Sequence, residues 1–500
     1  MPNSVIGAGL AVVLLCFAAA GIWIAWRRPF VGLGVLVGGM AFHNFALMAL
    51  LAMHTPAALI RVVQSWKELV LVLLSLLALQ QLLRARASWQ VRRLIATDWI
   101  AIAFAAVLVV YLLLPSSALP GSANFLQRLA AFRTAALIPL LYALGRIFSS
   151  PSELDLRDAF WLIVGAGAVV GAFGLYELWF VPTATWLDWG VNLFSSWLGF
   201  KYNGPAGLPA NFFQSLPDGL LLRRMVSTYI SPLGIAYTGL LAWPIAVVML
   251  DRPSLSRRVL AAIGVAAAFL LLGILFSVTR LALLMLAGEV VLLALLLRTR
   301  LAIGLAPVVI AGVAAVLFLY PQVGPVVDPY LLPGESHRHT ILYIGDPSFA
   351  EHLRALAADM KVVSHHVLGT GLGGSVHRFV QTTEDTTGAG ESAVLGFFGD
   401  VGVVGGVLYL ALYVLAMYLG LRAFLIAPRR SLAQALPLVA SVGGLVLIPI
   451  TLTSDVWSDF SVTFLFWWAV GYSASMVAPS GATRHLPTGG EARAENGTHW

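Results

Sequence analysis

The chain has 500 residues, of which 59% are hydrophobic and 11% are charged. Because soluble domains carry about 25% charged residues, this composition excludes an ordinary water-soluble protein and indicates a chain embedded in lipid. We expect the net charge of +7 to come from arginines that set membrane topology, and not from a nucleic-acid-binding surface. A single cysteine, Cys16, excludes an internal disulfide framework and a thiolate metal site.

The apolar runs predict an all-α polytopic membrane protein. About 20 apolar residues cross the hydrocarbon core of a bilayer, and on this criterion we expect roughly thirteen spans, within a range of about 12–14. No basic region precedes the first run, so we expect a retained span there and not a cleaved signal peptide. The expected spans are residues 5–26, 29–52, 67–83, 97–115, 127–148, 159–180, 226–250, 259–277, 280–297, 301–320, 393–421, 432–452 and 460–479.

Clusters of arginine predict the orientation of these spans. The clusters fall in alternate short connections, which the positive-inside rule assigns to the cytoplasm. The N-terminus and the long connections 181–225 and 321–392 are then expected outside, and the C-terminus inside. The clusters are Arg27/Arg28, Arg84/Arg86/Arg92/Arg93, Arg252/Arg257/Arg258, Arg298/Arg300 and Arg429/Arg430.

The long connections suggest how the chain is organised outside the spans. Residues 1–480 are expected to form one membrane domain, in which the outer loop 321–392 packs as a small helical cap. The stretch PSFAEHLRALAADMKVVSHH within it has apolar residues at helical spacing and predicts an amphipathic helix. Segment 181–225 is rich in tryptophan and phenylalanine, as interfacial segments are. The tail, residues 481–500, is predicted to be disordered and cytoplasmic.

Several charged residues occupy unusual places in this topology. The apolar stretch 259–297 is too long for one span and predicts a hairpin that turns near Ser277–Arg280, at the outer face. Arg280 could anchor the hairpin by snorkelling to lipid headgroups. Arg223 and Arg224 stand at the outer start of another span, where the positive-inside rule disfavours them. Glu391 opens a later outer-face span, where it could simply complement the helix dipole.

Together these residues suit phosphate chemistry. Arginine is permanently charged and forks two donors onto phosphate oxygens, and a neighbouring carboxylate can take a proton from an attacking hydroxyl. Four motifs contain these residues: Arg224-Met-Val-Ser-Thr-Tyr-Ile-Ser-Pro232, Ser277-Val-Thr-Arg280, His366-Val-Leu-Gly-Thr-Gly-Leu-Gly373, and Glu391 followed by Gly402 and Gly405.

In this order and on this side of the membrane, the motifs resemble those of the O-antigen ligase and Wzy-type O-antigen polymerase family of bacterial membrane glycosyltransferases. The resemblance covers about residues 220–410. It implies a GT-C-like fold in the bacterial inner membrane, an active site facing the periplasm, and a polyprenyl-diphosphate-linked glycan donor. Ligases of the family carry His-Asn where this chain has Glu391-Ser392, so the resemblance favours a polymerase.

The resemblance also implies residue roles. Arg224 and Arg280 would bind the diphosphate and stabilise the leaving group, and Glu391 would activate the acceptor hydroxyl, with inversion and without a metal or other cofactor. Further substrate contacts are expected from Arg223, Arg354, Arg378 and His366. The expected partners are the glycan donor, a glycan acceptor, the lipid bilayer and a chain-length regulator, and no nucleic acid.

Two alternatives remain open at the level of sequence. One is a ligase of the same family, which would move the glycan onto lipid A core or protein. The other is a lipid or glycan transporter, because many spans and an intramembrane carboxylate would also suit that function. That carboxylate, Glu289, is expected about 13 Å below Arg280, either neutral or paired with a polar residue such as His43. No pseudo-symmetric halves are visible, which argues against a transporter.

Overall fold

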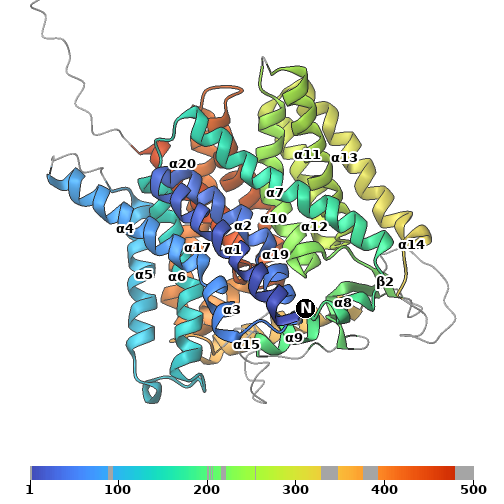
Figure 1. Ribbon diagram of the computed structural model, residues 1–500. Helices are drawn as coiled ribbons and strands as arrows, with labels where there is room; N and C mark the ends of the chain where they lie inside the picture. The colour runs from blue at the N-terminus through green and yellow to red at the C-terminus, as the bar shows by residue number, and fades with distance from the viewer. Residues whose placement is uncertain are drawn as a thin grey trace, which may run out of the picture.

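A computed structural model describes residues 3–87, 94–199, 202, 204, 207–215, 221–253, 255–327, 347–374 and 392–478. The structure is 81% helical, and within these described residues 13 helical segments are long and apolar enough to cross a membrane. They pack side by side in a single bundle (Figure 1). The predicted all-α polytopic membrane fold is therefore confirmed, with the expected number of spans.

The described residues before Pro232 supply six of these segments. Their helices and strands are α1 (Asn3–Arg27), α2 (Pro29–Ala52), α3 (Ala57–Gln64), α4 (Trp66–Ala87), α5 (Ala96–Leu113), η1 (Ser116–Ala118), α6 (Phe125–Ile147), α7 (Glu153–Phe180), α8 (Thr185–Asp188), α9 (Val191–Trp197), η3 (Ala210–Phe212), β1 (Phe213–Ser215), β2 (Leu221–Arg223) and η4 (Ser227–Tyr229). The two strands pair antiparallel, with Phe213 opposite Arg223.

The described residues from Pro232 onward supply the other seven and the predicted amphipathic helix, α15. Their elements are α10 (Pro232–Leu250), α11 (Arg257–Phe276), α12 (Arg280–Leu297), α13 (Arg300–Phe318), α14 (Tyr320–Val323), α15 (Pro347–His365), α17 (Ala393–Ile426), η6 (Leu432–Gln434), α18 (Ala435–Leu438), the π-helical turn η7 (Val439–Gly443), α19 (Gly444–Thr453), η8 (Val456–Ser458) and α20 (Phe460–Val477).

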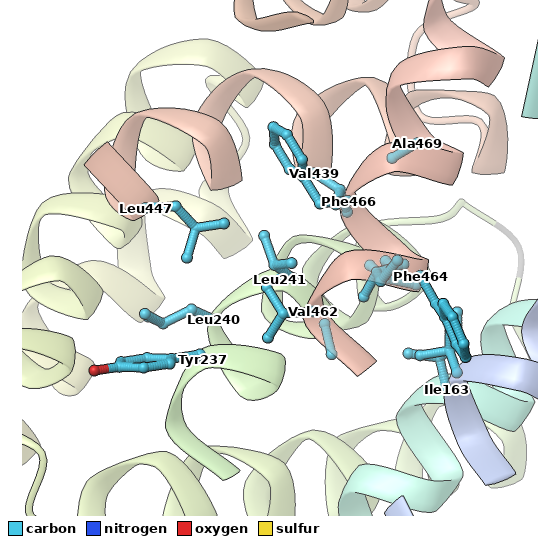
Figure 2. Close-up of a cluster of buried hydrophobic side chains, with 14 of the residues drawn as sticks. Ile163, Tyr237, Leu240, Leu241, Val439, Leu447, Val462, Phe464, Phe466 and Ala469 are labelled. Atoms are coloured by element: carbon cyan, nitrogen blue, oxygen red, sulfur yellow. The ribbon is translucent and has the colours of Figure 1, made fainter. Parts of the chain in front are cut away.

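Apolar side chains from the C-terminal spans fill the centre of the bundle. Helices α10 and α20 are buried along most of their length, whereas α1 and α5 are mostly exposed around the outside. Figure 2 shows Leu241 of α10 beside Val462 of α20, and Phe464 of α20 beside Ile163 of α7. A helix that is apolar all round is expected in the middle of a membrane domain, and the exposed apolar helices present the surface that lipid would cover.

Ion pairs join the helices at the end of the bundle that carries most arginines, here called the basic end. Arg28, before α2, donates to Asp155 and Asp158 of α7 at 2.6 and 2.8 Å. Arg252, after α10, pairs with Glu153 at the start of α7. The opposite end, here called the loop end, carries the α11–α12 turn, α8, α9 and α15, which lie low in Figure 1.

Helix boundaries differ from the sequence prediction where local backbone chemistry intervenes. Helix α10 begins at Pro232 and not at residue 226, because Ser227 and Ile230 have φ of 44° and 55°. Ser231 then caps the helix by accepting a hydrogen bond from the Gly234 amide. Residues 226–231 are apolar enough for a span, but the left-handed conformations of Ser227 and Ile230 exclude a continuous α-helix, and only the short η4 forms there.

Candidate functional site

The turn between α11 and α12 is the first part of the candidate site. It confirms the predicted hairpin, because α11 ends at Phe276 and α12 begins at Arg280. Ser277 closes the turn: its hydroxyl donates to the Ile274 carbonyl at 2.7 Å and accepts from the Thr279 amide at 3.3 Å. Val278 is fully buried with φ of 50°. Arg280 thus becomes the first residue of α12, half-buried at the positive end of its dipole.

Arg224 lies against this turn. Its Nε donates to the Ser277 carbonyl at 2.8 Å and its Nη2 to the Thr279 hydroxyl at 2.7 Å. The neighbouring backbone is held too, because the Met225 amide donates to the Phe276 carbonyl at 2.9 Å. Two residues that the sequence predicts to share a site, Arg224 and Arg280, are therefore brought to the same turn from segments more than fifty residues apart.

Among the residues that the structure describes, the buried charge of Arg224 has no carboxylate partner. The side chain is 9% exposed, and no carboxylate among the described residues forms an ion pair with it. Burial, together with the positive charge of Arg280, lowers the pKa of Arg224 to about 10. The guanidinium therefore stays protonated at neutral pH. Its described hydrogen-bond partners are a carbonyl and a hydroxyl. A buried cation in such surroundings favours an anion beside it.

Arg223 is used differently, although it is the adjacent residue. Successive residues of an extended strand point to opposite sides, and the Arg223 guanidinium turns toward α7, where it pairs with Glu177 at 3.4 Å. The Glu177 carboxylate also accepts from the Trp186 indole at 3.2 Å. Arg223 was predicted as a substrate contact, but its charge is already neutralised inside the protein. Glu177, which lies near the end of the predicted span 159–180, was not among the predicted site residues.

A chain of contacts leads from the arginines to the start of α17. The Tyr237 hydroxyl, on α10, points away from the apolar core (Figure 2), interacts electrostatically with Arg224 and hydrogen-bonds to the Ser454 side chain. The Ser454 carbonyl accepts from the Ala393 amide at 3.2 Å. Ser392 caps α17 through its hydroxyl, which accepts from the Leu395 amide. Glu391, the predicted base, lies outside the described residues and directly precedes this cap.

The glycine-rich motif 366–373 packs on a break in α17. Val401 and Gly402 depart from helical geometry, and Gly402 has φ of 68°. A β-carbon there would lie 2.7 Å from the Leu368 carbonyl carbon, and one on Gly369 would lie 2.5 Å from the Gly402 nitrogen. The two motifs of the sequence analysis thus meet backbone to backbone, and their glycines permit the close approach.

Two of the remaining predicted contacts, Arg354 and His366, lie in the part of the chain that the structure describes. Arg354 is exposed on α15 and His366 is half-buried just after it. Within the described part of the chain, neither forms a hydrogen bond or ion pair with Arg224 or Arg280. Arg378 lies outside the described residues. On α15 itself, Leu353 and Met360 of the predicted apolar face are exposed, and Asp359 is buried.

A second polar cluster at the loop end was missed by the sequence analysis. The buried ammonium of Lys67, at the start of α4, lies 3.2 Å from His43 Nε2 and 3.3 Å from Glu68. Arg133 of α6 lies 3.6 Å from the same carboxylate. Lys67 could have been noticed, because like Arg224 it is a basic residue at the expected outer start of a span. His43 therefore contacts Lys67 and not Glu289.

Glu289 lies at the middle of α12, fully buried. Neither of its carboxylate oxygens has a hydrogen-bond partner among the described residues. No group of three or more His, Cys, Asp or Glu side chains arranged to hold a metal ion occurs in the part of the chain that the structure describes.

No family model matches the chain, and no curated protein sequence is similar to it.

Proposed function

We propose that the protein is a membrane glycosyltransferase that polymerises polyprenyl-diphosphate-linked oligosaccharide units at the outer leaflet of the bacterial inner membrane. The observation that carries the proposal is the buried Arg224, whose charge lacks a carboxylate partner among the described residues. It stands beside Arg280 at the N-terminus of an 18-residue helix. Two guanidinium groups and the positive end of a helix suit a diphosphate.

In the proposed reaction, the donor diphosphate binds to Arg224 and Arg280. The acceptor hydroxyl oxygen forms a bond to the anomeric carbon while the bond from that carbon to the phosphate oxygen breaks. The electron pair of the broken bond goes to the diphosphate, where the two arginines stabilise it. Glu391 takes the hydroxyl proton. One displacement of this kind inverts the anomeric centre, and the arginines supply the charge stabilisation that a metal ion gives elsewhere.

The test uses purified full-length protein, a polyprenyl-diphosphate-linked oligosaccharide and EDTA, with products resolved on a gel. We expect a ladder of repeat units. Arg224→Lys should lower the rate about 100-fold, because lysine cannot reach both the Ser277 carbonyl and the Thr279 hydroxyl. Arg280→Ala and Glu391→Gln should act similarly. Arg257→Gln, an exposed arginine at the basic end, is the matched control and should keep the ladder.

Other products would reject the polymerase. Transfer of one preformed glycan to lipid A core or protein, without a ladder, would mean a ligase that uses the same arginines. An intact donor with every acceptor, together with movement of the donor lipid between the leaflets of reconstituted vesicles, would mean a transporter. Equal rates in Arg224→Lys and Arg257→Gln would show that Arg224 takes no part in the reaction, which would contradict the proposed role of the arginine pair.

A further inference from the structure

A cavity lies at the basic end of the bundle, the end opposite the arginine pair. It has a volume of about 570 Å³, which falls within the range of small-molecule sites. Its walls come from the start of α7, the connection that follows α10, the start of α11, and Leu432 of η6. Neither the proposed reaction nor the four motifs use any of its residues.

One wall of this cavity is cationic. Arg157, Arg252 and Arg258 line it together with a single acidic residue, Asp158, which leaves a net charge of +2 on the lining. The Asp158 carboxylate is already engaged, since it accepts from Arg28 at 2.8 Å and from Arg157 at 3.2 Å. Arg258, in contrast, is exposed, and no acidic partner of it is found among the described residues. Arg252 pairs with Glu153, but the Glu153 side chain is 71% exposed, and solvent weakens such a pair. Arg258 and the weakly paired Arg252 therefore have positive charge to offer an anion.

The other wall is apolar and opens toward the lipid-facing surface. Val259 and Ala262, one turn apart on α11, line the cavity and are exposed. Trp161 of α7 lines it as well, and tryptophan is typical of the membrane interface, where its ring lies at headgroup level. The cavity thus combines a cationic part at the helix ends with an apolar part that runs along the span.

We propose that this cavity binds an anionic phospholipid. The phosphate would lie between Arg252 and Arg258, and one acyl chain would lie along Val259 and Ala262. A basic pocket between transmembrane helices at the arginine-rich end suits an anionic headgroup, and the charge excludes a preference for zwitterionic lipid. A soluble anion would use the arginines but not the apolar wall. The site is separate from the proposed reaction, so either proposal can fail without the other.

The experiment uses delipidated full-length protein in a neutral detergent, with lipid binding measured by native mass spectrometry and by thermal unfolding. The probes are phosphatidylglycerol, phosphatidylcholine with the same acyl chains, and inorganic phosphate. We expect phosphatidylglycerol alone to bind and raise the unfolding temperature. Removing an arginine next to an anionic headgroup should weaken binding about fivefold. Arg252→Gln with Arg258→Gln should therefore weaken it about 25-fold, while Arg257→Gln, the exposed neighbour outside the cavity, should not.

A second pair of variants tests the apolar wall. Ala262→Trp fills the cavity and should abolish phosphatidylglycerol binding, whereas Ala261→Trp, on the adjacent exposed position outside the cavity, should leave it intact. Three results would overturn the proposal. They are equal weakening by Arg257→Gln, which would indicate diffuse surface charge; equal binding of phosphatidylcholine; and displacement of the lipid by inorganic phosphate at equal concentration.

Discussion

Arg223 and Arg224 are neighbours of the same type, yet the fold gives them opposite electrostatic environments. The Arg223 guanidinium meets the Glu177 carboxylate, and both side chains are less than a tenth exposed. The Arg224 guanidinium meets a carbonyl and a hydroxyl. Sequence reasoning treated both as substrate contacts, because hydropathy and the positive-inside rule see only their position along the chain. Which of the two finds a carboxylate depends on the side of the strand toward which each points.

The Arg223–Glu177 pair predicts a stability effect. Glu177→Gln alone leaves the buried Arg223 guanidinium without its counter-ion. We expect a loss of about 3 kcal/mol of stability, because a buried charge without a partner is strongly destabilising. Arg223→Gln should be similarly harmful. The double variant should regain much of the loss, since no charge then remains unpaired. Thermal unfolding in detergent measures all three, and a double variant as unstable as the sum of the singles would contradict the pairing.

Helix α17 shows how one element can join two motifs. Its 34 residues are too many for a straight crossing, and the interruption at Val401 and Gly402 admits the loop of residues 366–373. The Thr370 amide donates to the Gly399 carbonyl at 2.7 Å, and the Val403 amide to the Val367 carbonyl at 2.9 Å. The loop thereby satisfies backbone groups that the broken helix leaves without partners. The spacing of the glycines was visible in the sequence, but the contact between Gly369 and Gly402 was not.

Substitution of Gly402 is therefore expected to lower stability far more than substitution of Gly396 in the same helix. Gly402→Ala places a β-carbon at positive φ and against the Leu368 backbone, so we expect a destabilisation of about 2–4 kcal/mol. Gly396→Ala is the control, because a β-carbon there meets no atom within 4 Å and alanine favours a helix. Unfolding temperatures compare them. Equal stability of the two variants would mean that the loop yields to the added methyl.

For the whole molecule, hydropathy was enough to predict the number of spans and most of their limits. An apolar run about 20 residues long can cross lipid as a helix, which satisfies its own backbone hydrogen bonds, and few other structures can do so. The sequence did not predict the kink between α3 and α4 at Ser65, the π-helical turn in Val439–Gly443 or the Lys67 cluster. These features depend on which helices become neighbours, and periodicity along one chain carries no such information. The convergence of Arg224 and Arg280 was expected only because two motifs were assigned to the same face.

The orientation of the bundle in the membrane gives a prediction that is independent of any activity. Ser117 and Ser150 are exposed at opposite ends of α6. In a Cys16→Ser background, Ser117→Cys should react with a membrane-impermeant maleimide in intact cells, and Ser150→Cys only after permeabilisation, because the basic end is expected inside. The reverse labelling pattern would mean that the arginine pair faces the cytoplasm, and it would exclude a reaction at the outer leaflet.

The way in which Arg224 is held has a consequence for recognition. Two of its guanidinium nitrogens are fixed by protein acceptors, and its own amide donates to the Phe212 carbonyl at 2.9 Å. An arginine side chain carries about 2 kcal/mol of rotamer entropy, and here that freedom is lost when the protein folds. In the proposed reaction, the donor diphosphate would therefore order nothing at this residue. Discrimination among anions would then rest on the fit of their shape to a donor that does not move.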